Sequence, residues 1–228
     1  MYTIQDICTL NIIRAQRELG VPVEEIGAYL ERRTVEVTLD FLDEEEALLG
    51  RKMAELEAAR AEASERRSRL LRYGGAATGR GASRNIGARP YVFLREDVIL
   101  EREIDFLLKK LEKRHQDSIK IIGKQTMGAI LDGESLKKGV YNHFSCVFFL
   151  TEQERPHDAA LPGGEYASLF YRGAYDRLEE HWRALRAGLE AQGLTPDGPP
   201  LELYHIDAHD TNREEEYVTE LQVRVARA

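Results

Sequence analysis

The sequence predicts an α+β protein, and two observations support this class. Residues 1–73 show only helical patterns, namely two short helices followed by a long one. Residues 91–228 alternate short β-type runs with helical runs, in the order βαββ followed by βαββ. We therefore expect a small helical part at 1–38, a long helix at 39–73, a linker at 74–90 and an α+β domain at 91–228.

The composition limits the classes of partner. Of the 228 residues, 43% are hydrophobic and 32% are charged, and the net charge is −8 with a pI near 5.4. An acidic chain disfavours nonspecific binding to nucleic acid or membranes and suits cationic ligands. The two cysteines are far apart in sequence, and no apolar run approaches the roughly 20 residues that span a bilayer. We expect a cytoplasmic protein with no membrane partner, no cofactor and no bound metal.

The first 38 residues predict a pair of helices. Thr3 can cap the first helix with Asp6 as its partner three positions on. Leu19-Gly20 predicts its end, because glycine tolerates the left-handed conformation after a helix. Pro22 can begin the second helix at its first turn. The pair is too small to form a domain alone.

The stretch from 38 to 73 predicts one long helix. Apolar residues recur at heptad steps in one seam: Leu42, Leu49, Leu56, Ala63 and Leu70. The second seam holds one apolar and three charged residues: Met53, Glu46, Arg60 and Arg67. A half-apolar seam favours an antiparallel or partly covered coiled coil. We interpret 39–73 as a dimerisation helix, and the alternative is a solvated helix packed on its own domain.

The remaining pattern places a linker and then eight elements. The glycines and small residues of 74–90 predict a flexible linker or loop. We expect strands at 91–96, 118–131, 140–150, 166–173, 201–209 and 216–225, and helices at 99–115 and 176–193. The repeated order suggests an internal duplication. Tyr91 and Tyr166 begin the two copies, and subtraction of their numbers gives an offset of 75. This offset lays Cys146 on Leu221 and Phe148 on Val223.

Two βαββ units related in this way are expected to form a sheet with helices on one face and a concave surface between the halves, which is a natural site for a small molecule. In the last predicted strand, Glu220 alternates with Leu221 and Val223, so it lies on the opposite face from this apolar set. The plain interpretation is a solvated carboxylate. The alternative is a partly desolvated carboxylate in the groove, where it would meet a cation between aromatic walls.

Aromatic residues that could supply such walls are Tyr141, Phe144, Tyr166, Tyr171, Tyr175, Trp182 and Tyr204. Each one alone is also explained by ordinary core packing. Tyr204 and His205 are adjacent in one predicted strand, so they face opposite sides and only one of them can line the groove.

Other motifs are weak. The run His205-Ile206-Asp207-Ala208-His209-Asp210 has residues that bind metals, but it lies at a strand end and the last two belong to a turn. Ser145 and Cys146 have no glycine-rich elbow, which disfavours a nucleophile. The stretch 123–128 lacks the spacing of a phosphate-binding loop.

The three parts together resemble a known family. Residues 1–38 resemble the later helices of the MerR family's winged-helix DNA-binding domain, through Leu19-Gly20-Val21-Pro22-Val23-Glu24-Glu25-Ile26. Residues 39–73 resemble that family's antiparallel dimerisation helix. The C-terminal part resembles the GyrI-like effector domain of multidrug-sensing MerR regulators. The residues that carry this third resemblance are Tyr171, Gly173, Tyr175, Leu178, Trp182, Tyr204, Asp207 and 216–222.

The resemblance implies specific roles. Glu220 matches the pocket acid that meets cationic or polar ligands, so the resemblance favours the groove interpretation, and Trp182 and Tyr204 match aromatics that line that pocket. We add Tyr171, Tyr175 and Tyr141 as further candidate ligand-binding residues, and we assign no catalytic residue.

The resemblance has one departure, at the N-terminus. The family's helix-turn-helix and most of its wing precede the point where this sequence begins, so we expect the DNA-reading head to be missing. Tyr2, Arg14 and Arg17 are weak candidates for DNA contacts, because two arginines on a net negative chain do not hold DNA specifically. Promoter DNA and RNA polymerase are partners only if a helix-turn-helix is encoded upstream.

The function implied is a ligand-responsive, MerR-like transcriptional regulator. It would be a homodimer through 39–73 and would bind amphipathic or cationic aromatic molecules in its C-terminal domain. Two alternatives remain, namely a stand-alone protein that sequesters such compounds, and a GyrI-like hydrolase in which a pocket glutamate and tyrosine activate water.

Overall fold

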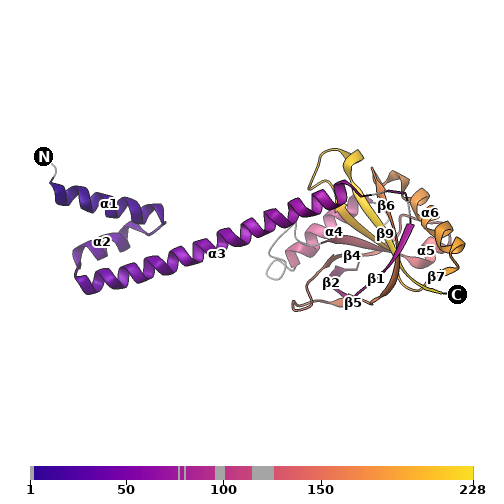
Figure 1. Ribbon diagram of the computed structural model, residues 1–228, viewed down its shortest axis with the longest axis horizontal. Helices are drawn as coiled ribbons and strands as arrows, with labels where there is room; N and C mark the ends of the chain where they lie inside the picture. The colour runs from indigo at the N-terminus through magenta and orange to yellow at the C-terminus, as the bar shows by residue number, and fades with distance from the viewer. Residues whose placement is uncertain (1–2, 77, 80, 96–100, 115–125, 228) are drawn as a thin grey trace. The chain divides into compact units, whose positions relative to one another are not determined.

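The computed structural model describes residues 3–76, 78–79, 81–95, 101–114 and 126–227. The chain divides into two compact units, Met1–Ala63 and Ser64–Ala228, which are described separately below (Figure 1). Among the described residues, no helix has the length and apolar character needed to cross a membrane.

The first unit consists of helices, as expected. Helix α1 (Ile4–Glu18) begins with a capping box, in which the Asp6 amide donates to the Thr3 hydroxyl and the Thr3 amide donates to the Asp6 carboxylate at 2.8 Å. It ends before Gly20, whose φ of 85° is the left-handed conformation expected there. Helix α2 (Val23–Glu31) follows Pro22. These start and stop signals are confirmed.

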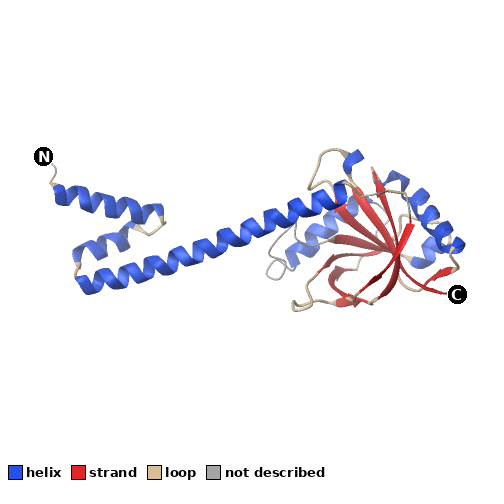
Figure 2. Cartoon of the chain, viewed as in Figure 1, coloured by secondary structure: helices blue, strands red, loops and turns tan. Residues whose placement is uncertain are grey.

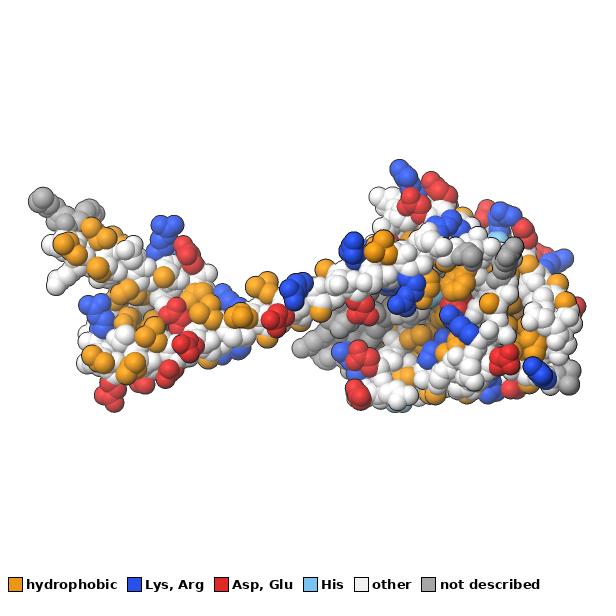
Figure 3. Space-filling view, viewed as in Figure 1, with side chains coloured by type: hydrophobic (Ala, Val, Ile, Leu, Met, Phe, Trp, Pro, Cys, Tyr) orange, Lys and Arg blue, Asp and Glu red, His pale blue; other side chains and the backbone are white. Residues whose placement is uncertain are grey.

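Helix α3 (Val35–Gly74) is one continuous helix that begins in the first unit. The Tyr29 ring of α2 stacks on Phe41 of α3 with 4.2 Å between ring centroids, and Gln16 of α1 donates to Glu45 of α3 at 2.6 Å. None of the residues of α3 is fully buried within this single chain. Hydrophobic side chains are visible along its surface in Figure 3.

The second unit contains the end of α3 and an antiparallel sheet. The described strands are β1 (Gly81–Ile86), β2 (Arg89–Leu94), β3 (Met127–Leu131), β4 (Phe144–Leu150), β5 (Ala159–Leu161), β6 (Gly164–Arg172), β7 (Leu194–Pro196), β8 (Leu201–Ile206) and β9 (Val218–Arg227). Their order across the sheet is β1-β6-β9-β8-β3-β4-β2-β5, and β7 pairs with β9. The central strands β9, β8 and β3 therefore come from both halves of the domain.

Two helices cover one face of this sheet (Figure 2). They are α4 (Glu101–Arg114) and α6 (Leu178–Ala191), and a short helix α5 (Gly133–Lys137) lies between β3 and β4. The main core fills the space between these helices and the sheet, with Leu111 from α4, Trp182 from α6 and Leu221 from β9 among its most buried members. We call this the helix-covered face.

The opposite face has a core of its own, because the sheet curls over it. Phe148 from β4, Tyr166 from β6 and Leu203 from β8 belong to this second core. Strands such as β8 therefore have no side in contact with water. We call this the inner face of the curl.

The expected linker needs correction, and some elements of the structure were not expected. Part of the predicted linker, Gly81–Ile86, is strand β1, which pairs with β6 at one end of the sheet and is mostly exposed, so its small and polar residues suit an edge position. Short elements α5, β5 and β7 were not expected. Residues 118–125 of one predicted strand lie outside the described residues, and only Met127–Leu131 is observed as strand.

The offset of 75 does not keep the final strands of the two copies in phase. It matches Phe148 to Val223, but Phe148 lies in the inner core whereas Val223 lies in the helix-covered core. One extra or missing residue reverses the face of every residue that follows it, so a single offset does not relate the final strands of the two copies.

Candidate functional site

The candidate site is built on β8, in the middle of the sheet. All six residues of Leu201–Ile206 are buried. Residues two apart share a face, so Glu202 and Tyr204 point to the helix-covered face and Leu203 and His205 point to the inner face. This confirms the expectation that Tyr204 and His205 lie on opposite sides.

A buried carboxylate forms the centre of the site. Glu202 is 1% exposed, and it accepts hydrogen bonds from the Trp182 indole nitrogen at 3.4 Å and from the Tyr204 hydroxyl at 3.2 Å. A carboxylate taken out of water is tolerated only when such donors replace its hydration. Burial raises the pKa of Tyr204 well above its usual value, and the negative charge of Glu202 raises it further, so the hydroxyl keeps the proton that it donates.

Further aromatic rings lie on the same face of the sheet as this carboxylate. The Tyr175 ring meets Tyr204 edge-on, with 5.6 Å between centroids and an interplanar angle of 77°. Tyr171 stacks on His181 of α6 at 4.3 Å. Thr219 of β9 lies opposite Tyr204 in the register, and its hydroxyl is buried without a hydrogen-bond partner among the described residues. The site thus combines one anion, several π faces and one unused hydroxyl.

An open pocket of about 600 Å³ adjoins this arrangement. Its walls are mainly apolar side chains from β3, β9, α5 and α6: Leu131, Val223, Leu136, Trp182, Leu185 and Leu189. Trp182 both lines the pocket and donates to Glu202, so it connects the open volume to the buried carboxylate. Its polar lining consists of Asp132, Lys137, Ser145 and Arg186. A cavity of this size with mainly apolar walls is typical of a small-molecule site.

The structure brings together five of the six residues expected to bind ligand. Trp182, Tyr204, Tyr171 and Tyr175 lie on the helix-covered face with Glu202, and so does Tyr141, whose ring is 5.8 Å from the Arg183 guanidinium. The sixth residue, Glu220, lies elsewhere.

Glu220 faces the inner side of the curl. It is 0% exposed and accepts from His205 Nε2 at 2.9 Å, from Arg84 at 2.7 Å and from Gln222 at 2.9 Å. Its burial on the face opposite Leu221 and Val223 agrees with the expectation of a desolvated carboxylate, and the alternative of a solvated carboxylate is wrong. Trp182 and Tyr204 lie on the other face of the sheet, so the structure does not bring them together with Glu220.

The pKa directions of this inner pair follow from burial and contact. Burial lowers the pKa of His205, and the hydrogen bond and charge of Glu220 offset this only in part. Burial raises the pKa of Glu220, but the hydrogen bond and charge of His205, with Arg84, outweigh it and leave the pKa below its usual value. A neutral His205 that donates from Nε2 to an ionised Glu220 is consistent with the lowered pKa of both groups.

Glu202 is the residue that the sequence interpretation missed. The signal was present, because Glu202 stands two positions before Tyr204 in the same strand and therefore shares its face. A buried strand with a glutamate between two leucines is unusual enough to mark a polar site.

The other candidates are peripheral. Tyr2 lies outside the described residues, Arg14 pairs with Glu18 at 3.2 Å on the surface of α1, and Arg17 is exposed. Asp207 accepts from the backbone of His209, and Asp210 accepts from Arg66 and Arg69. Within the described ranges, no group of three or more metal-binding side chains is positioned to hold an ion.

Comparison with known proteins identifies the family. The model of the GyrI-like small molecule binding domain matches residues 84–226, which is more than half of the chain. The chain therefore belongs to the GyrI-like family.

Solved structures show the same fold at low identity. The EcmrR–DNA complex in EcmrR-RPo is 16% identical with a TM-score of 0.51, covering 100% of this chain and 86% of that chain. The EcmrR C-terminal domain is 17% identical with a TM-score of 0.49, covering 65% and 98%. A hydrolase from Listeria innocua is 10% identical with a TM-score of 0.49, covering 67% and 94%. Among curated proteins, none matches this chain.

Proposed function

We propose that this protein is a ligand-responsive, MerR-like regulator whose GyrI-like domain binds amphipathic aromatic cations at Glu202. The observation that carries the proposal is the buried Glu202 carboxylate, held by Trp182 and Tyr204 beside an apolar pocket. Membership of the GyrI-like family supports a small-molecule site, and the Glu202 carboxylate supports a positively charged ligand.

The preference for a cation follows from electrostatics. A buried carboxylate attracts a positive charge more strongly than an exposed one does, because little water screens it. The faces of Trp182, Tyr204 and Tyr175 add cation–π attraction, which is worth about 2 kcal/mol per contact when the cation is desolvated. A flat aromatic cation therefore satisfies the charge, the π faces and the apolar walls together.

Dimerisation through 39–73 is the second part of the proposal. Leu42, Leu49, Met53 and Leu56 are all exposed in the single chain and fall on the two heptad seams of α3. Exposed apolar residues repeated at this spacing are typical of a coiled-coil contact. A partner helix along this surface would bury them. Promoter DNA and RNA polymerase become partners if a helix-turn-helix precedes this chain, and the similar EcmrR structure is a complex with DNA.

The test uses the sole tryptophan as the reporter. Trp182 is the chain's single tryptophan, so its fluorescence should change when a cationic dye such as rhodamine 6G binds. Glu202→Gln keeps the size of the side chain and removes the charge, and we expect it to weaken dye binding by about ten-fold or more. Glu220→Gln is the matched control on the other face, and it should bind nearly as tightly as the parent.

The outcomes separate the two glutamates. If Glu220→Gln loses binding and Glu202→Gln keeps it, the ligand lies on the inner face and the assignment of Glu202 is wrong. If a neutral analogue of the dye binds as tightly as the cation, the electrostatic argument fails.

A hydrolase is the second candidate, and the same pair of residues favours it. Tyr204 and Glu202 lie within hydrogen-bond distance of each other, as a tyrosine and a carboxylate that activate water would. Multiple turnover of an electrophilic ester, abolished in Glu202→Gln, would support catalysis. Binding of the ester without turnover would exclude it for that substrate class.

A further inference from the structure

The last turn of α3 is attached to the reverse side of β8. The Tyr73 ring stacks on the His205 ring with 3.7 Å between centroids and an interplanar angle of 11°. Phe170 of β6 completes this aromatic cluster, 6.0 Å from Tyr73 and 5.7 Å from His205. His205 is 4% exposed, so Tyr73 helps to cover a buried imidazole.

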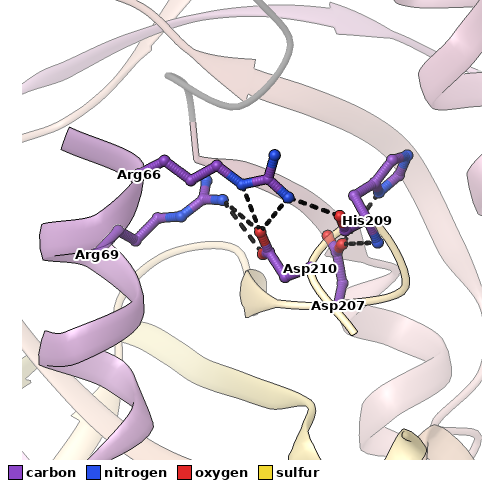
Figure 4. A network of polar contacts seen from close by, with 5 residues as sticks. All are labelled: Arg66, Arg69, Asp207, His209 and Asp210. Atoms are coloured by element: carbon purple, nitrogen blue, oxygen red, sulfur yellow. Dashed lines mark hydrogen bonds and ion pairs between the residues drawn. The ribbon is translucent and has the colours of Figure 1, made fainter. Parts of the chain in front are cut away.

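A polar network holds the same helix end (Figure 4). The Asp210 carboxylate, in the loop after β8, is 3% exposed and accepts from Arg66 at 3.0 Å and from Arg69 at 3.2 Å. Arg172 of β6 donates to the Gly74 carbonyl at 2.8 Å, which satisfies one of the free carbonyls at the helix end. Residues 66–74 thus contact His205 at the end of β8, the loop that follows it, and β6.

The point of attachment is a bulge in the sheet. The pairing of β8 with β9 shifts register between Tyr204 and Ile206, so His205 is the extra residue. A bulged residue leaves the regular hydrogen-bond ladder and can redirect its side chain, and bulges concentrate near functional sites. His205 uses this freedom to reach Glu220 and Tyr73 on the inner face.

Ligand and helix therefore meet on adjacent residues of one strand. Tyr204 belongs to the proposed ligand site, and the next residue, His205, carries the contact to α3. A cation that binds Glu202 competes with the Tyr204 hydroxyl for that carboxylate. Tyr204 is covalently linked to His205, so a shift of Tyr204 would also move the ring that stacks on Tyr73 at 3.7 Å.

We propose that ligand binding at Glu202 and Tyr204 loosens the docked C-terminal end of α3, residues 66–74, by displacing His205 from Tyr73. The proposal rests on the function proposed above and names how that site is regulated. Linkage makes it reciprocal: if the ligand weakens docking by some factor, then a substitution that weakens docking must tighten ligand binding, by at most that factor.

The experiment compares two arginines on the same helix. Arg69→Gln removes a contact to Asp210, whereas Arg67→Gln changes an exposed arginine on α3 that takes no part in the network of Figure 4. With rhodamine 6G as the probe, we expect Arg69→Gln to bind about five-fold more tightly than the parent and Arg67→Gln to bind equally. Tyr73→Ala should tighten binding in the same direction.

A second measurement needs no variant. Hydrogen–deuterium exchange of the amides in 66–74 should be faster in the dye complex of the unmodified protein than in the free protein. Equal affinities for the Arg69 and Arg67 variants, with unchanged exchange in a protein that binds the dye, would overturn the coupling alone. A parent protein that does not bind the dye would overturn the proposed function and the coupling with it.

Discussion

Gly128 is a position at which one added carbon should separate two central strands. It lies in the middle of β3, opposite Phe148 of β4 and Leu203 of β8. A Cβ built on Gly128 would lie 2.4 Å from the backbone carbonyl oxygen of Glu202 and 2.5 Å from the ζ-carbon of Phe148. The carbonyl is part of the backbone of β8, and the Phe148 ring is fully buried, so neither neighbour can move aside.

The cost follows from overpacking. Extra atoms in a filled core typically destabilise a protein by about 1–3 kcal/mol, and a clash with backbone belongs at the upper end. We therefore expect Gly128→Ala to lower the free energy of unfolding by about 3 kcal/mol, a large part of the 5–15 kcal/mol typical of a domain. The displaced strand carries Glu202, so dye binding should weaken as well.

Urea unfolding followed by Trp182 fluorescence measures this change in the unit that contains β3. Gly188→Ala is the matched control, because Gly188 lies within α6 and a Cβ there meets nothing within 4 Å. Alanine is the better helix former, so this variant should gain about 0.5–1 kcal/mol. An unchanged urea midpoint for Gly128→Ala would refute the packing argument.

Three further predictions concern pH, thiol reactivity and assembly. Because the folded pKa of His205 lies below its usual value, the unfolded chain binds that proton more tightly, and the free energy of unfolding should fall as pH drops below about 6.5. The lowered pKa of Glu220 extends this loss below about pH 4.5, and His205→Gln should remove the first part of the slope in urea titrations at several pH values. Burial raises the pKa of Cys146 to about 11, whereas Cys8 is exposed, so iodoacetamide should label Cys8 in the folded protein and Cys146 only after unfolding, as mass spectrometry can show. Leu56→Glu places a charge on the exposed seam of α3 and should shift a dimer towards monomer in sedimentation velocity, and a parent that sediments as a monomer would contradict the proposed assembly.

Local signals in the sequence were sufficient for the helices. Thr3 and Asp6 form the expected capping box, and Gly20 takes the left-handed conformation that ends α1. The 3.6-residue spacing of Leu178, Trp182, Leu185 and Leu189 indicates a helix. The observed bounds of α6 lie within two residues of the predicted bounds, 176 and 193, at both ends. Such features depend on neighbours within a few residues, and the sequence displays them directly.

The faces of the sheet could not be derived in the same way. Alternation identifies an inward face only if the other face meets water, and β9 buries both, from Leu221 on one side to Glu220 and Gln222 on the other. The register shifts at Ile130 and His205 also change the phase within a strand pair. These shifts result from pairing between strands that are distant in the sequence, and the hydrophobic periodicity of a single strand does not reveal them. The resemblance identified the GyrI-like family correctly, but it grouped Glu220 with Trp182 and Tyr204, which lie on the other face of the sheet.

The complete burial of β8 has a consequence for how this gene tolerates change. An ordinary strand at a surface accepts substitutions at every second codon. Leu201–Ile206 has no such position, because each of its side chains is buried on either the helix-covered face or the inner face of the sheet. Saturation mutagenesis should therefore show a continuous block of six intolerant codons there, whereas Gly81–Ile86 in β1, with five exposed residues, should accept most replacements.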